Sequence, residues 1–273
     1  MIKYALLLPA VGFSFIFTLW PLLEAGRLSF LQTNFITTKF VGLQNYIDSF
    51  SNEAFLQSAF NSLAYMAVFV PGQILLSLAA SICVFRLSKR WQDAARIIFY
   101  VPTLAAGIII AQVWRWIFHQ DGFVNWILAF AGIESISWFA QGLTAIPAVA
   151  LIVLTASFGG CTILLLASLQ SIDKAIFDAA RIDGASWRQT KWRIIVPILA
   201  PTVGMIALLS AISALQVFET IYALAPYDYA ATMAFHIYRQ GFQFSKYGLA
   251  SAQAVILLAA TVGISLVKNK VAA

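Results

Sequence analysis

The sequence predicts an all-α, polytopic membrane protein with about six transmembrane helices and a cytoplasmic helix-turn-helix loop. Of its 273 residues, 61% are hydrophobic and only 10% are charged, and the mean hydropathy is +0.85. Soluble domains carry about 25% charged residues, so lipid is the solvent that this composition fits. The apolar residues also gather into long runs, and most basic residues lie between alternate runs.

Six apolar runs have the length that a membrane span requires. A hydrocarbon core about 30 Å thick is crossed by roughly 20 apolar residues in a helix. The first run follows Lys3 without a small-residue cleavage site, so we interpret it as a retained helix rather than a signal peptide. The connections leave no room for a soluble domain, and we expect residues 1–273 to form one transmembrane domain. The predicted spans are residues 4–24, 61–85, 97–118, 145–168, 197–222 and 248–267.

Lysine and arginine predict the orientation of the spans, because short cytoplasmic loops are enriched in them. We expect both termini to face the cytoplasm. This asymmetry also explains the net charge of +6, and the basic residues form no stripe with interleaved aromatics that would indicate nucleic-acid binding. Twelve of the 17 basic residues fall in one alternating set of segments: Lys3, Arg86, Lys89, Arg90, Arg96, Lys174, Arg181, Arg188, Lys191, Arg193, Lys268 and Lys270.

Residues 169–196 are the longest polar segment in the predicted cytoplasmic loops and have the pattern of a helix, a turn and a second helix. Asp173 precedes good helix formers and can accept a hydrogen bond from a free N–H of the first helix. Gly184 can adopt the positive φ that ends a helix. Pro197 is placed to open the fifth span, where its missing N–H leaves no bond unmade.

Small residues in this loop allow another backbone to approach closely, which suits docking into the groove of a partner. The alternative is an amphipathic helix that lies flat among lipid headgroups. On physical grounds alone the two alternatives are about equal. The small residues are Ala179, Ala180, Gly184 and Ala185.

The same segment resembles a known motif. Residues 178–185 are Asp-Ala-Ala-Arg-Ile-Asp-Gly-Ala, and Pro197 follows. This run is similar to the EAA loop of permease subunits in binding-protein-dependent ATP-binding-cassette (ABC) importers, whose pattern is Glu-Ala-Ala, two residues, Asp-Gly-Ala and a later proline. The likeness favours docking over the flat helix. Asp178 departs from the usual Glu, and Asp173 stands where proline is common.

The resemblance extends over nearly the whole chain. Residues 40–46, Phe-Val-Gly-Leu-Gln-Asn-Tyr, look like an external element of the sugar and glycerol-phosphate permease group, and residues 169–172, Leu-Gln-Ser-Ile, match that group's lead into the loop. A third departure is residues 223–229, where relatives often carry a Gly-Gly-Pro turn.

The resemblance implies a transport subunit without an ATPase site, and the sequence has no Gly-x-x-x-x-Gly-Lys-Ser/Thr phosphate loop. The implied partners are a second, related permease that completes a heterodimer, two cytoplasmic ATPase subunits that use ATP and Mg²⁺, an extracytoplasmic solute-binding protein, and membrane lipid. We expect no cofactor or metal on this chain, and a location in the cytoplasmic membrane of a bacterium or archaeon. The residues that the resemblance assigns to ATPase coupling are Asp178, Ala179, Ala180, Asp183, Gly184, Ala185 and Pro197.

Polar residues on the fifth predicted span are candidates for contact with the solute. They recur at three- and four-residue spacing, which places them on one helix face. A polar stripe in a bilayer is expected to face the bundle or a water-filled path, although hydrogen bonding between helices is an equal alternative. Gln216 is the first candidate for a ligand hydroxyl, with Glu219 nearby. The residues on this face are Ser210, Ser213, Gln216 and Thr220, and the candidates for solute contact are Ser213, Gln216, Glu219 and Thr220.

Two other classes of function are weaker. An ion- or proton-coupled secondary transporter would need ionisable residues near the bilayer midplane and often has repeated halves. A membrane-embedded enzyme would need paired carboxylates or metal-ligand spacing, whereas His119 and His236 stand alone. The group resembled transports sugars, oligosaccharides or sugar-alcohol phosphates, and we expect a solute of this type.

Overall fold

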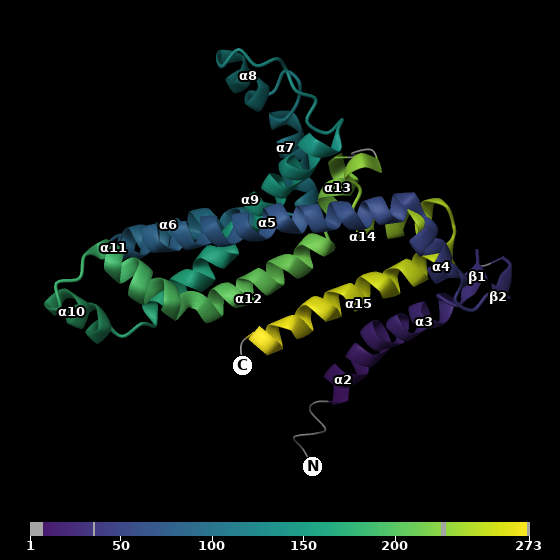
Figure 1. The fold of residues 1–273 in the computed structure, drawn as a ribbon, viewed down its shortest axis with the longest axis horizontal. Coiled ribbons are helices and arrows are strands. Elements are labelled where there is room, and N and C mark those ends of the chain that lie inside the picture. Colours follow the sequence, from purple (N-terminus) through teal and green to yellow (C-terminus); the bar gives the residue numbers. More distant parts are fainter. Residues whose placement is uncertain (1–7, 35, 225–227, 272–273) are drawn as a thin grey trace.

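The computed structural model describes residues 8–34, 36–224 and 228–271, which form a bundle of long helices (Figure 1). Within these residues, a sixth candidate span is divided into Lys89–Leu104 and Gly107–Ile117, which meet at 96°. The prediction of an all-α membrane protein with about six spans is therefore confirmed. The undivided candidate spans are Leu8–Leu28, Glu53–Phe85, Gly142–Gln170, Trp187–Leu215 and Tyr247–Leu266.

Short connections join the elements. The first part of the chain contains α2 (Leu8–Ser14), η1 (Phe15–Leu19), α3 (Trp20–Leu28), β1 (Leu31–Thr33), β2 (Thr38–Phe40), α4 (Gln44–Ser51), α5 (Glu53–Phe85), α6 (Lys89–Tyr100), η2 (Val101–Leu104), α7 (Gly107–Ile117) and α8 (Phe123–Phe130). The second part contains α9 (Gly142–Gln170), α10 (Lys174–Ile182), α11 (Trp187–Thr190), η3 (Lys191–Ile195), α12 (Val196–Leu215), α13 (Glu219–Leu224), η4 (Asp228–Ala230), α14 (Met233–Tyr238), η5 (Arg239–Gln243) and α15 (Tyr247–Val271).

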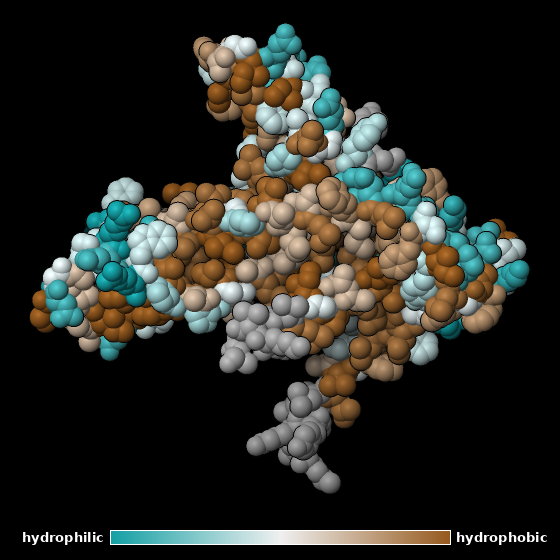
Figure 2. Space-filling view, in the orientation of Figure 1, coloured by the Kyte–Doolittle hydropathy of each residue, from teal (hydrophilic) through white to brown (hydrophobic). Residues whose placement is uncertain are grey.

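The long helices run side by side and separate two polar ends. In Figure 1, α10 and α11 lie at one end of α5, α9 and α12, and the β1–β2 hairpin and α4 lie at the opposite end. Helix α3 packs on α15, while α7 and α8 project to one side. Figure 2 shows hydrophobic side chains over the long helices and hydrophilic ones over the two ends. An apolar belt between polar ends is what a lipid environment requires.

The second predicted span begins eight residues too late. Helix α5 starts at Glu53 because Asn52 caps it, with its side chain accepting a hydrogen bond from Phe55 N at 3.0 Å. The polar residues of its first turns, Ser58 and Asn61, are buried in the protein rather than exposed to lipid. A prediction based on hydropathy therefore leaves these turns out of the span, because it treats polar residues as lying outside the membrane. The first span ends at Leu28 instead of residue 24, and its predicted start at residue 4 lies outside the described residues.

The prediction of one unbroken third span over residues 97–118 is wrong. Helix α6 gives way to the 3₁₀ turn η2, which contains Pro102, and the backbone is extended at Ala105 and Ala106 before α7 begins. Proline lacks an N–H and so favours such a break. The break turns the chain by 96°, so that α7 projects to one side of the long helices (Figure 1).

The predicted fifth span, residues 197–222, is wrong at both ends. The helix is continuous from Trp187 to Leu215, so Pro197 lies inside it and does not open it. A π-helical turn precedes the proline, and Val196 N donates to Lys191 O across this turn. Such turns accommodate a residue that disrupts the regular hydrogen-bond ladder. The helix ends at Leu215, and α13 is a separate short helix.

The sequence analysis did not predict the β1–β2 hairpin. Leu31 pairs with Phe40 and Thr33 with Thr38, whose side-chain oxygens lie 2.9 Å apart. Asn45 holds the adjoining backbone, because its Nδ2 donates to Ser29 O at 2.8 Å and to Leu31 O at 2.9 Å.

The hairpin gives the external run of residues 40–46 a structural role. Gly42 in this run has a φ of +59°, and Tyr46 shares a 2.7 Å hydrogen bond with the hydroxyl of Ser29. The run thus closes the hairpin and attaches it to the end of the first span.

Side chains of α5 hold the irregular segment between α13 and α14. Asn61 Nδ2 donates to Tyr229 O and Ala231 O, each at 3.0 Å, and Tyr65 donates to Ala230 O at 3.1 Å. These backbone carbonyls have no helix ladder, and the side chains take its place. The contacts join residues that are more than 160 positions apart in the chain.

Helices α6 and α9 approach each other closely at Gly159. A Cβ atom at this position would overlap the carbonyl oxygen of Phe99, whereas a Cβ at Gly160 would meet nothing within 4 Å. The absence of a side chain at Gly159 therefore lets the two helices pack closely. The neighbouring glycine supplies a matched comparison.

We predict that Gly159→Ala destabilises the purified protein by about 1–3 kcal/mol, the usual effect of overpacking, because α6 must move away from α9. Thermal unfolding in detergent measures the effect as a lower Tm. Gly160→Ala is the control and leaves the Tm unchanged or raises it slightly. Equal Tm values for both variants would contradict the close approach.

Candidate functional site

Helix α10 is fixed at both ends by side chains and turns that the sequence predicted. Asp173 caps it, with Oδ1 accepting from Ala175 N at 2.9 Å. At the other end Gly184 has a φ of +70°, Gly184 N donates to Arg181 O, and Ala185 N donates to Ala180 O at 2.9 Å. These two bonds form a Schellman motif, for which glycine is the preferred residue.

The second helix of the loop begins at once. Ser186 and Gln189 form a capping box, in which each side chain accepts a hydrogen bond from the other residue's backbone N–H. The guanidinium of Arg86 lies over the Trp187 ring, 4.9 Å from its centroid, and joins the loop to the end of α5. The predicted helix-turn-helix is therefore present, with its second helix continuous with the fifth span.

Hydrogen bonds between side chains brace the base of this element. Arg96 donates to Gln170 Oε1 at 2.7 Å, and Gln170 donates to Gln92 Oε1 at 2.9 Å. Gln92 in turn donates to the carbonyl of Phe85 at the end of α5. The ends of three spans are thus tied together beside α10.

The predicted coupling residues do not all lie on one surface. Ala180 is buried and packs inward, Ala185 is half-buried, and Pro197 is exposed on the long helix rather than on α10. The sequence analysis did not identify Ile182 as a contact residue, yet it is 86% exposed at the end of α10. The remaining predicted coupling residues are exposed: Asp178, Ala179, Asp183 and Gly184.

A cavity of about 600 Å³ lies where α5, α7, α9, α12 and α13 meet. The break in the third span borders it, since Thr103 and Gly107 are in its wall, and so does Gln216 at the end of α12. Irregular backbone at membrane depth occurs where it is covered by protein or lines a water-filled space. All four residues predicted to contact solute line this cavity, and Ser210 joins them: Ser213, Gln216, Glu219 and Thr220.

The single helix face predicted for Ser210, Ser213, Gln216 and Thr220 is wrong. They do not lie along one helix face, because the helix ends at Leu215 and Gln216 is its C-cap, with φ −101° and ψ 8°. The break instead redirects the chain so that Glu219 and Thr220 return to the cavity from α13. Their convergence depends on tertiary structure rather than on helical periodicity.

Gln73 is a cavity residue that the sequence analysis missed. Its side chain is 0% exposed, and its Oε1 accepts from Ser157 Oγ at 3.0 Å. Its Nε2 has no hydrogen-bond acceptor among the described residues, and the neighbouring thiol of Cys161 is only a weak acceptor. An unpaired buried donor costs about 1–3 kcal/mol. A lone glutamine in an apolar run gives no sequence signal for this environment.

Glu219 lies at the break in the third span. A Cβ atom added to Gly107 would come within 2.6 Å of Glu219 Oε2, so the carboxylate lies against the first residue of α7. The first N–H groups of a helix lack intrahelical acceptors and favour a negative charge nearby. Glu219 is exposed and belongs to none of the ion pairs found among the described residues.

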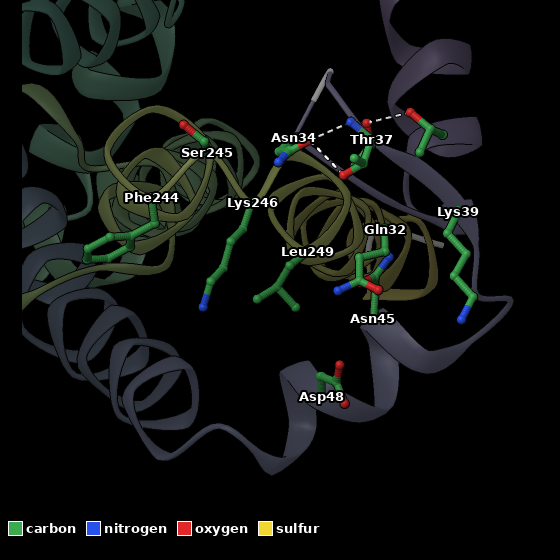
Figure 3. Close-up of a pocket in the computed structure, with 12 residues that line it drawn as sticks. Gln32, Asn34, Thr37, Lys39, Asn45, Asp48, Phe244, Ser245, Lys246 and Leu249 are labelled. Carbon is green, nitrogen blue, oxygen red and sulfur yellow. Dashed lines mark hydrogen bonds between the residues drawn. The ribbon is translucent and has the colours of Figure 1, made fainter.

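The hairpin end carries a polar pocket of about 640 Å³ (Figure 3). In Figure 3, Lys39 and Lys246 lie on opposite sides of the pocket with Asp48 between them. These three charged side chains form no ion pair with another described residue. Ser245, in the same wall, has a φ of 54°, a conformation that is uncommon for a residue other than glycine.

Comparison with known proteins identifies the family. Residues 72–269 match the family model described as "Binding-protein-dependent transport system inner membrane component". The chain belongs to this family. It is therefore a multi-pass inner membrane protein, a permease of a binding-protein-dependent ABC importer, and a transport subunit rather than an enzyme. This membership sets aside the ion-coupled carrier and the membrane enzyme.

The similarity covers almost the full length of several relatives. The trehalose/maltose transport system permease protein MalF of Thermococcus litoralis is 28% identical over 277 residues, which is 98% of this chain and 92% of the relative. A bacterial ABC transporter that imports the acidic polysaccharide alginate has a chain with a TM-score of 0.86 and 26% identity, covering 99% of this chain and 94% of that one.

A second structure of the alginate transporter includes a periplasmic protein. It is a complex with an alginate pentasaccharide-bound periplasmic protein, and its matching chain has a TM-score of 0.85 and 25% identity over 98% of this chain and 93% of that chain. The departure at residues 223–229 falls partly outside the described residues, at 225–227.

Proposed function

We propose that this permease moves a carbohydrate-type solute into the cytoplasm by alternating access, with the 600 Å³ cavity as part of its path. The chemistry of the cavity wall carries this proposal. Hydroxyl and amide groups project from an otherwise apolar wall, an arrangement that suits a polyhydroxylated ligand. The relatives named for trehalose, maltose and alginate support the same class of solute. The hydroxyl and amide groups belong to Gln73, Thr103, Ser157, Ser210, Ser213, Gln216 and Thr220.

We assign ATPase coupling to the exposed end of α10. Ile182 offers an apolar anchor between charged neighbours, and Gly184 lets a partner backbone approach, which suits insertion into a groove. In this proposal two cytoplasmic ATPase subunits hydrolyse ATP with Mg²⁺, and their movement reaches the spans through the braced base of the loop. Ala180 supports α10 from within, and Pro197 shapes the long helix.

The proposed orientation places α10 and both termini in the cytoplasm. The hairpin end then faces outward, where an extracytoplasmic solute-binding protein delivers its ligand. The unpaired charges of Lys39, Lys246 and Asp48 give that protein a polar surface to bind. A second, related permease completes the heterodimer and the wall of the path.

Reconstitution tests the energy source. The sugar is first identified by thermal-shift screening of ligands against the binding protein. We then expect proteoliposomes to take up this sugar when they contain this permease, its partner permease and the ATPase subunits and are supplied with the binding protein. Uptake should persist with an ionophore and stop without ATP. Uptake by this chain alone, or uptake driven by an ion gradient, would contradict the proposal.

We predict that Gly184→Trp abolishes uptake while membrane insertion is retained, because the indole blocks the approach of the ATPase. Uptake and solute-stimulated ATP hydrolysis in proteoliposomes measure the loss. The control is Gly132→Trp, since Gly132 also has a positive φ, of +73°, and nothing within 4 Å of an added Cβ. Both variants carry the same backbone strain, so normal uptake by Gly184→Trp would remove α10 from the coupling mechanism.

We predict that Gln73→Met raises the KM for the transported sugar about three- to tenfold, with little change in kcat, as expected for the loss of one neutral hydrogen bond. Initial uptake rates over a range of sugar concentrations measure both constants. The matched control is Gln253→Met. Gln253 is also 0% exposed with unpaired amide atoms, but it lies outside the cavity wall. Gln253→Met is expected to leave the KM unchanged. If Gln73→Met has the same KM as Gln253→Met, Gln73 does not bind the solute.

A further inference from the structure

We propose that the cavity selects an uncharged, polyhydroxylated solute over an acidic one, with Glu219 as the residue that rejects anions. This inference rests on the proposed function, because it assumes that solute enters the cavity. It narrows the class of solute, since acidic sugars and sugar phosphates are then disfavoured.

The charges in the cavity wall carry the proposal. Among the described residues that line it, Glu219 is the only one with a charged side chain, and no lysine, arginine or histidine accompanies it. All other polar groups in this wall are hydroxyls, amides and a thiol. A cavity that binds an anion ordinarily presents arginine, lysine or free N–H groups to it. This wall presents one carboxylate instead.

The position of Glu219 strengthens the effect. The N-terminus of a broken transmembrane helix is a favourable place for an anionic group of a substrate. In this chain that place, at Gly107 of α7, is already next to the carboxylate of Glu219. A second negative charge would meet repulsion there, whereas a sugar hydroxyl can donate to the same carboxylate. Gln73 Nε2, on α5, is a buried donor in the same wall that has no hydrogen-bond acceptor among the described residues.

Membership of the family does not determine whether the solute is neutral or acidic. One relative is named for trehalose and maltose, and a structural neighbour is described as an importer of an acidic polysaccharide. The same fold therefore serves neutral and acidic carbohydrates. The charge on the cavity wall is a physical basis for the difference.

Cys161, which also lines the cavity, allows the local potential to be measured without knowledge of the solute. The probes are two methanethiosulfonates, one with a trimethylammonium group and one with a sulfonate group. Each reagent is applied to the assembled transporter, and mass spectrometry of the Cys161 peptide gives the rate at which Cys161 is modified. Each rate is divided by the rate of the same reagent with 2-mercaptoethanol. Cys83→Ala removes the other cysteine of this chain.

We expect the normalised rate to be about tenfold higher for the cationic reagent than for the anionic one, because the Glu219 carboxylate attracts the first and repels the second. Glu219→Gln should bring the ratio close to one. Glu134→Gln, which removes an exposed carboxylate outside the cavity wall, should leave the ratio unchanged. Gel filtration of the assembled complex checks that each variant is folded.

The outcomes separate the two proposals. Reaction of Cys161 without charge preference, or a preference that Glu219→Gln leaves unchanged, overturns the selection by charge and leaves the solute path intact. Failure of both reagents to reach Cys161 overturns the cavity as a solute path, and the proposed function with it.

Discussion

In a bilayer, each backbone N–H and C=O must find a partner inside the protein, and this constraint determines where the chain can leave the helical form. Among the described residues, one span is broken before α7 and another ends at Leu215 in α12, and both places border the same cavity. Breaks that faced lipid would leave polar groups unpaired at a cost of several kcal/mol each. Of the candidate solute contacts, Gln216, Glu219 and Thr220 follow the end of α12, whereas Gln73 lies on the continuous helix α5.

The same constraint explains the polar side chains inside the bundle. Asn61 and Tyr65 replace the missing ladder bonds of the segment between α13 and α14. Gln73 is different, because only one end of its amide is paired. A buried donor left open beside a cavity is unfavourable for stability, and functional sites are where such departures are expected.

The two ends of the bundle are built in different ways. At one end, local motifs shape α10 and α11, namely a cap at Asp173, a Schellman motif at Gly184 and a capping box at Ser186, while longer-range side-chain bonds brace their base. At the other end, contacts distant in sequence hold the hairpin, including those of Asn45. A rigid α10 on a braced base can transmit displacement, because its turns leave few soft torsions.

The number of spans, the helix-turn-helix, the cap at Asp173 and the turn at Gly184 could be predicted from the sequence alone, because hydropathy, caps and glycine turns are local properties. Family resemblance named the importer. Tertiary structure decided the break in the third span, the inward position of Ala180, the continuity of the helix through Pro197 and the place of Gln73. It also brought Glu219 into the cavity along a path that helical periodicity does not describe. These features depend on how helices that are distant in sequence pack together. The residues around a given position cannot tell which side chains it will contact across the bundle.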